Sequence, residues 1–146
     1  MNSFKVGSES YWPGKNKITT IDLLKRAAKA NLTAMDLNYP DHFIDCPLRE
    51  LTQIFEETGI SLNGLAMRYY SEASFKLGAF TNPSSEIRRL AIDQTKKGID
   101  TVSSLNGNLM TLWMGQDGVD YSFQGNYSSM WDWTIEAMAE IADYNP

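Results

Sequence analysis

The sequence contains one cysteine and one histidine among its 146 residues, and this scarcity narrows the chemistry open to the chain. With Cys46 alone, no disulfide can form within the chain. A catalytic thiol would need a base and an orienting acid, and the only histidine, His42, lies four residues earlier. We therefore expect Cys46 to be a packed residue, and no serine or cysteine has the partners of a nucleophilic triad.

Basic residues and long apolar runs are also few. The chain has 13 Lys and Arg against 18 Asp and Glu, a formal net charge of −5 and a pI near 4.8. This acidity disfavours binding to nucleic acid or to an anionic membrane surface. No run approaches the roughly 20 apolar residues of a membrane helix, and the first residues lack the basic and apolar segments of a signal peptide. We expect a cytoplasmic protein with neither nucleic-acid nor membrane partners.

A ready-made metal site is missing as well. Asp41, His42 and Asp45 are the one cluster of a histidine with carboxylates, and they follow one another in a short loop beside two prolines. A loop can present two or three ligands to a metal, but polar groups in such a loop are more commonly solvated. We expect solvated side chains here and no metal bound by this chain alone.

Short apolar runs alternate with amphipathic stretches and predict the fold class. Strands are expected over 4–8, 34–37, 60–67 and 109–113, each followed by a helix. The expected helix signals are an N-cap at Thr19 or Thr20, Pro47 in a first turn, Gly59 past a helix end, and serine caps at 84 or 85. The expected apolar faces include Leu24, Leu51, Ile54, Leu90, Ala91, Met130 and Ile135.

The βαβαβαβα order predicts parallel strands with right-handed crossovers. A doubly wound dinucleotide-binding sheet would carry a G-x-G-x-x-G turn after the first strand, and residues 8–14 contain none. A TIM barrel requires eight such units. Four units therefore form either half a barrel or a small open sheet.

Aromatic, amide and charged residues gather at the ends of the predicted strands. In a parallel barrel these ends share one face, which carries the active site. Aromatic rings can cover the apolar face of a sugar while amides and carboxylates bind its hydroxyls. Any one of these rings could be a packing residue, but the whole set favours a pocket. The residues expected to bind substrate are Trp12, Asn38, Tyr70, Phe75, Trp113 and Gln116; no catalytic residue is assigned.

Two motifs resemble xylose isomerases. Residues 75–81 read F-K-L-G-A-F-T and lead into I-R-R-L-A-I at 87–92, which resembles an F-K-x-G-x-F-T loop and an I-R-R-x-A-I helix of that family. About twenty residues later, W-M-G-Q-D-G at 113–118 resembles W-G-G-R-E-G at the end of strand four. The resemblance implies an α/β fold: residues 1–146 form a single partial domain, the amino-terminal (βα)4 half of a TIM (β/α)8 barrel with parallel strands and outer helices.

The same resemblance implies a sugar isomerase or epimerase, with this chain supplying pocket walls. Asn38 stands where xylose isomerases carry a ring-opening histidine, so the broader isomerases and epimerases of other ketoses and of inositol intermediates fit better. A divalent metal (Mn, Mg or Co) is expected in the full-length protein, with ligands on strands five to eight, beyond Pro146. The fragment alone is expected to be inactive.

Two alternatives stay open. The chain could be a non-catalytic half-barrel that assembles with its missing carboxyl-terminal half or with itself. Nucleases of abasic DNA share the superfamily fold, although the acidic charge disfavours them.

Overall fold

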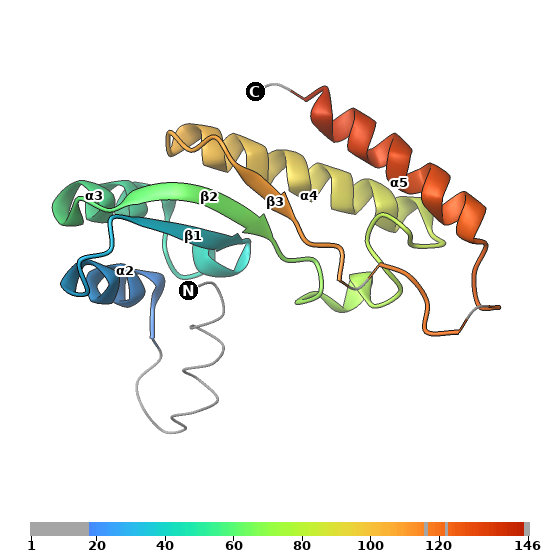
Figure 1. The fold of residues 1–146 in the computed structure, drawn as a ribbon, viewed down its shortest axis with the longest axis horizontal. Coiled ribbons are helices and arrows are strands. Elements are labelled where there is room, and N and C mark those ends of the chain that lie inside the picture. Colours follow the sequence, from blue (N-terminus) through green and yellow to red (C-terminus); the bar gives the residue numbers. More distant parts are fainter. Residues whose placement is uncertain (1–17, 116, 122, 145–146) are drawn as a thin grey trace. The chain divides into compact units, whose positions relative to one another are not determined.

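The computed structural model describes residues 18–115, 117–121 and 123–144 and has the predicted alternation of helices and strands (Figure 1). The sheet has the order β1-β2-β3, with parallel strands. Its strands are β1 Ala34–Tyr39, β2 Ser61–Met67 and β3 Met110–Leu112. The helices are α2 Thr20–Lys29, α3 Leu48–Thr58, α4 Ser85–Ser104 and α5 Tyr127–Ala142, with short 3-10 turns η1 Asp41–Phe43 and η2 Ala73–Phe75. The predicted strand at 4–8 lies outside the described residues.

The contacts divide the described chain into two compact units. The first comprises residues 18–66 and 102–111, and the second comprises residues 67–101 and 112–144. The first unit contains α2, β1, α3 and most of β2. The second contains most of α4 and all of α5, together with the segments that follow β2 and β3.

Local signals begin and end the helices of the first unit as predicted. The Thr19 side chain accepts a hydrogen bond from the Asp22 backbone N–H at 3.2 Å, and the Asp22 carboxylate accepts one from the Thr19 N–H at 3.0 Å. This reciprocal pair is a capping box, and the hydrogen bond from the Thr19 backbone lowers the pKa of Asp22. Helix α3 ends at Gly59, whose φ of 69° is left-handed.

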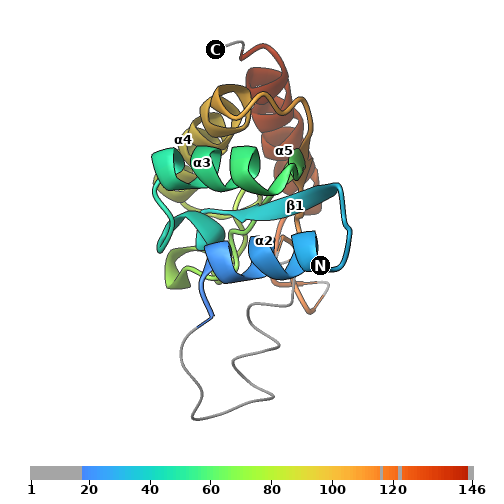
Figure 2. The same ribbon diagram turned by 90° about the vertical axis from the view of Figure 1, so that its left-hand side faces the viewer.

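The core of the first unit lies between its helices and strands. Leu24 of α2, Leu37 of β1, Leu51 of α3 and Leu65 of β2 are all fully buried in one cluster. Helices α2 and α3 pack against each other, and both lie beside β1 in Figure 2. Cys46 is buried in the same cluster, which confirms its prediction as a packed thiol.

The apolar faces of α4 and α5 differ in part from the prediction. Ala91 and Met130 are buried as expected, but Leu90 is exposed, and Ile135 is 52% exposed. In α5 the buried residues are Met130, Ala137 and Ile141. Apolar residues occur on several sides of α5, so their spacing alone did not identify the side that packs.

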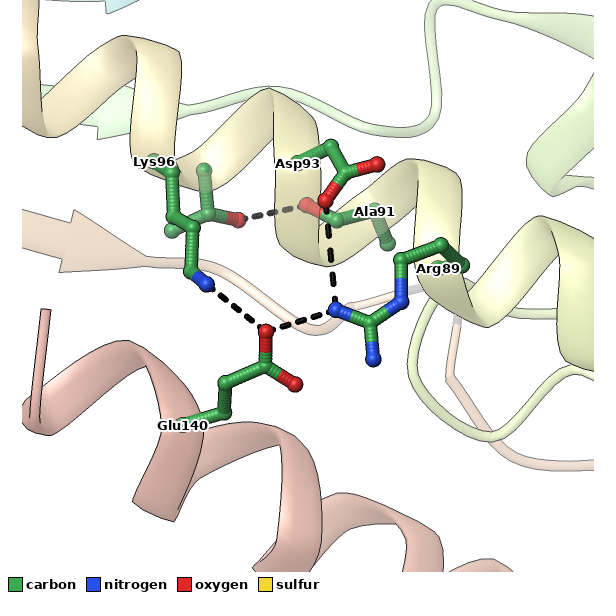
Figure 3. Close-up of polar contacts among 6 residues, drawn as sticks. Arg89, Ala91, Asp93, Lys96 and Glu140 are labelled. Atoms are coloured by element: carbon green, nitrogen blue, oxygen red, sulfur yellow. Dashed lines mark hydrogen bonds and ion pairs between the residues drawn. The ribbon is translucent and has the colours of Figure 1, made fainter.

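A cluster of charges joins α4 to α5 within the second unit (Figure 3). One oxygen of Glu140, on α5, accepts hydrogen bonds from Arg89 at 2.6 Å and from Lys96 at 2.7 Å, both on α4. The hydrogen bond from Arg89, followed by that from Lys96, lowers the pKa of Glu140 to about 2. The cluster therefore favours packing of the two helices only while Glu140 is ionised.

Replacing Glu140 with glutamine is expected to destabilise the chain in a pH-dependent way. At pH 7 the loss should be about 0.5–1 kcal/mol, because the group is partly exposed and screened by solvent. The depressed folded pKa means that the stabilisation is complete above the ordinary value of 4.5 and is lost as the pH falls toward 2. Urea unfolding at several pH values should show the wild type and Glu140→Gln converging in acid. Glu136→Gln, on the same helix, is the control, and at pH 7 it should change the free energy of unfolding by no more than about 0.5 kcal/mol.

Candidate active-site wall at the ends of β2 and β3

Two exposed aromatic rings meet in the second unit, next to the ends of neighbouring strands. Tyr70 follows the end of β2 at Met67, and Trp113 directly follows the end of β3 at Leu112. The two ring centroids are 6.2 Å apart, with the planes at 70°. Tyr70 is 48% exposed and Trp113 is 53% exposed. The pair therefore offers an open aromatic surface at the strand ends, where barrel enzymes bind their substrates.

The Arg68 side chain contacts both rings of this aromatic pair. Its guanidinium carbon lies 5.1 Å from the centroid of Tyr70 and 5.4 Å from that of Trp113. Arg68 itself is buried. A cation over two rings contributes about 0.5–2 kcal/mol for each contact, so Arg68 fixes the position of both rings.

Asp117 joins the two motifs that resemble xylose isomerases. Its Oδ1 accepts three hydrogen bonds: from the Ala79 N–H at 3.0 Å, from the Thr81 N–H at 2.8 Å and from the Thr81 hydroxyl at 2.8 Å. The Gly118 N–H donates in turn to the Thr81 hydroxyl at 3.2 Å. We call residues 75–82 the anchored loop. Its attachment to Asp117 brings the two motifs into contact within the second unit.

Two glycines leave room for neighbouring side chains in this arrangement. Gly78, in the anchored loop, has a φ of +100°, and a Cβ there would collide with the Thr81 hydroxyl. A Cβ at Gly115 would collide with the indole of Trp113. The first glycine lets the loop close onto Asp117, and the second leaves room for the Trp113 ring.

A buried aromatic layer supports the site. The side chain of Tyr69 is fully buried, and its hydroxyl lies 2.5 Å from that of Thr95 in α4. The Tyr69 ring meets Phe75 and Phe80 of the anchored loop edge to face, with centroids 5.6 and 5.2 Å away. Burial raises the pKa of Tyr69, so its hydroxyl stays protonated. The Thr95 hydroxyl donates to the Ala91 carbonyl at 2.7 Å, so its oxygen is open to the proton of Tyr69.

The structure brings together only some of the predicted substrate-binding residues. Tyr70 and Trp113 are in contact, as their positions after neighbouring strands suggested. Phe75 is fully buried against Tyr69. Trp12 and Gln116 lie outside the described residues. A role in sugar binding stays a prediction for each of these residues.

Asn38 belongs to the first unit, in β1, and is buried. Its backbone N–H donates to Nδ1 of His42 at 3.0 Å. The expectation that His42 is solvated was wrong, because its side chain is almost fully buried. The Thr20 hydroxyl donates to the backbone oxygen of His42 at 2.8 Å and lies 3.1 Å from Asp45 Oδ1. Thr20 precedes His42 by 22 residues, so local sequence patterns could not predict that this hydrogen bond buries His42.

The described residues contain no group of three or more His, Cys, Asp or Glu side chains that could hold a metal ion. None of their helices has the length and apolarity needed to cross a membrane. The donor set for a divalent metal is therefore not gathered within the described part of the chain.

Sequence comparison finds xylose isomerases among the relatives. The chain is 28% identical to the xylose isomerase of Thermus thermophilus over 97 residues, which cover 66% of this chain and 25% of that protein. It is also 28% identical to the xylose isomerase of Tetragenococcus halophilus over 98 residues, covering 62% and 22%. The chain spans about a quarter of the length of these curated relatives. No family model matches it.

Structural comparison finds a D-psicose 3-epimerase from Clostridium cellulolyticum H10, solved with D-tagatose. The TM-score is 0.65 at 19% identity, and the match covers 91% of this chain and 45% of the epimerase chain. The fold is therefore that of half a TIM barrel. Together with this fold, the sequence matches support a relationship of the chain to the xylose isomerase-like TIM-barrel superfamily. Its relatives there are sugar isomerases and epimerases, which supports an isomerase-type enzyme at the level of the family.

Proposed function

We propose that the chain forms part of a sugar isomerase or epimerase and supplies one wall of its sugar-binding pocket. The contact between Tyr70 and Trp113 carries this proposal, because two half-exposed rings stand together next to the ends of neighbouring strands. Rings so placed suit the C–H face of a pentose or hexose. Similarity to proteins named as xylose isomerases and as a D-psicose 3-epimerase supports this class of substrate.

The residues of the wall bind and orient rather than transfer protons. Trp113 and Tyr70 would bury one face of the sugar and exclude water from it. Arg68 keeps the two rings in place, and Asp117 keeps the anchored loop against the segment that follows β3. We assign no acid or base to this chain. The proton or hydride transfer of the proposed aldose–ketose isomerisation or ketose epimerisation would use groups of the complete enzyme.

We propose that the divalent metal of the complete enzyme (Mn, Mg or Co) is held by residues outside this chain. The described residues do not gather a suitable donor set. Calorimetric titration of the chain with MnCl2 should therefore show no binding at micromolar concentration. A clear isotherm with one site would contradict this assignment and would place metal ligands within the chain.

Binding of a ketose tests the proposed function directly. D-psicose or D-tagatose, titrated into the chain and followed by equilibrium dialysis, should bind saturably in the millimolar range, about −4 kcal/mol. Trp113→Ala should weaken binding about tenfold, because it removes one ring of the wall. Trp131→Ala removes an exposed indole from α5 and is the matched control, with unchanged binding. Equal effects of the two substitutions would contradict the proposal.

The chain could instead be a non-catalytic half-barrel, and a complete lack of sugar binding would favour that alternative. A cytoplasmic location and the lack of nucleic-acid and membrane partners stay predictions from the composition.

A further inference from the structure

A groove lies between helices α4 and α5 of the second unit. Its volume is about 570 Å³, and small-molecule sites commonly have about 300–1,000 Å³. Ile92 of α4 and Ala137 of α5 line the groove, and both are almost fully buried, so they form an apolar floor. Trp133 of α5 adds an indole ring to the lining. The groove is therefore a hollow with an apolar base.

The two arginines that line the groove are already held within the chain. Arg88 donates from Nη1 to two backbone oxygens that precede α4, at 2.7 and 3.1 Å, and its guanidinium carbon lies 4.0 Å from the centroid of the Trp133 ring. Arg89 donates to Glu140 at 2.6 Å, as Figure 3 shows. The first guanidinium is thus fixed against the indole, and a carboxylate balances the charge of the second.

Two further carboxylates of the groove have no such partner. Glu86 lines it from α4 and Glu136 lines it from α5. Both side chains are exposed, and neither makes an ion pair or a hydrogen bond with another described residue. With Glu140, the groove has three carboxylates against two guanidinium groups. The unbalanced charge is therefore negative and favours a cation over an anion as the ligand.

We propose that this groove binds an organic cation with ammonium groups on an aliphatic stem. The stem would cover the apolar floor of Ile92 and Ala137 and remove it from water. An ammonium group would pair with Glu86 and Glu136 through charge-assisted hydrogen bonds. A small cation without a stem would use the carboxylates but leave the floor uncovered.

Two sources supply this chemistry, a free diamine and the lysine side chain of a peptide. The proposal does not depend on the proposed function, because the lining of the groove includes neither Tyr70 nor Trp113. Failure to bind a cation would therefore leave the proposed sugar site untested, and failure to bind a sugar would leave the groove untested.

The indole N–H resonances of the full chain test the proposal. On titration with 1,5-diaminopentane at low salt, the Trp133 resonance should shift saturably. The resonance of Trp131, which is exposed on the same helix and does not line the groove, should not shift. Ammonium chloride at matched ionic strength supplies the charge without the stem. It should need at least about a tenfold higher concentration for the same shift of the Trp133 resonance.

Two double variants separate the carboxylates of the groove from the net charge of the chain. Glu86→Gln with Glu136→Gln should weaken binding of the diamine at least about tenfold. Glu50→Gln with Glu56→Gln removes the same charge from exposed positions of α3 and should leave binding unchanged. Circular dichroism verifies that both double variants fold.

A short peptide with one lysine, blocked at both ends, distinguishes the two sources of the ligand. Tighter binding of this peptide than of the diamine would support a protein partner, and the reverse would support a free amine. The proposal is overturned if neither probe shifts the Trp133 resonance, or if ammonium chloride shifts it at the same concentration as the diamine. Equal binding of the diamine by the two double variants would also overturn it.

Discussion

Replacing Asp117 with alanine is expected to lower the free energy of unfolding by about 3–5 kcal/mol. The change removes the acceptor of three hydrogen bonds from Ala79 and Thr81. Both of these residues are buried, so water cannot readily replace the lost partner. Each buried donor left without an acceptor costs about 1–3 kcal/mol. Urea unfolding monitored by circular dichroism measures the loss.

Two further variants separate this role from a general effect of charge. Asp120→Ala removes an exposed carboxylate three residues away and should change stability by no more than about 0.5 kcal/mol. Asp117→Asn keeps one acceptor oxygen, so its loss in the free energy of unfolding should lie between those of Asp117→Ala and Asp120→Ala. A loss for Asp117→Ala no larger than that for Asp120→Ala would show that Asp117 does not anchor the loop.

Replacing Gly78 with alanine is expected to cost about 2–4 kcal/mol. Its φ of +100° is strained for any residue with a side chain, and the new Cβ would push against the Thr81 hydroxyl. That hydroxyl donates to Asp117, so the substitution also disturbs the anchor of the loop. Thermal unfolding of the variant should show a lower midpoint temperature. Hydrogen exchange should show faster exchange of the backbone amides in the anchored loop.

Gly59→Ala is the matched control for the positive φ. Gly59 has a φ of +69°, and a Cβ there would have no atom within 4 Å. Its substitution should therefore lower the free energy of unfolding only by the cost of a left-handed backbone for a residue with a side chain, about 1–2 kcal/mol. Gly78→Ala and Asp117→Ala act on the same contacts, so their effects together should be smaller than the sum. Equal losses for the two glycine substitutions would argue against the collision with Thr81.

Local patterns predicted the elements of this fold, because their signals lie within a few residues of one another. The capping box at Thr19 and the left-handed Gly59 each involve neighbours in sequence. The packed side of α5 could not be predicted in the same way. Apolar residues surround that helix, and tertiary packing leaves Ala137 buried beside α4 while Ile135 is exposed.

The part of the candidate site that lies at the strand ends could be predicted from the sequence. Tyr70 and Trp113 follow neighbouring strands, and parallel pairing brings them together. The anchoring role of Asp117 was not predictable, because its partner Thr81 lies 36 residues earlier. The motif 113–118 contained the signal, but the sequence does not show which backbone groups a carboxylate accepts.

The central claim is that Trp113 lies in the wall of a sugar site, and the indole N–H resonances of the chain test it most directly. The four tryptophans, at positions 12, 113, 131 and 133, give four such resonances. On titration with D-psicose, the account predicts a saturable shift for the Trp113 resonance, while the resonances of Trp131 and Trp133 on α5 do not shift. A Trp113 resonance that does not move, or that moves no more than that of Trp131, would contradict the account.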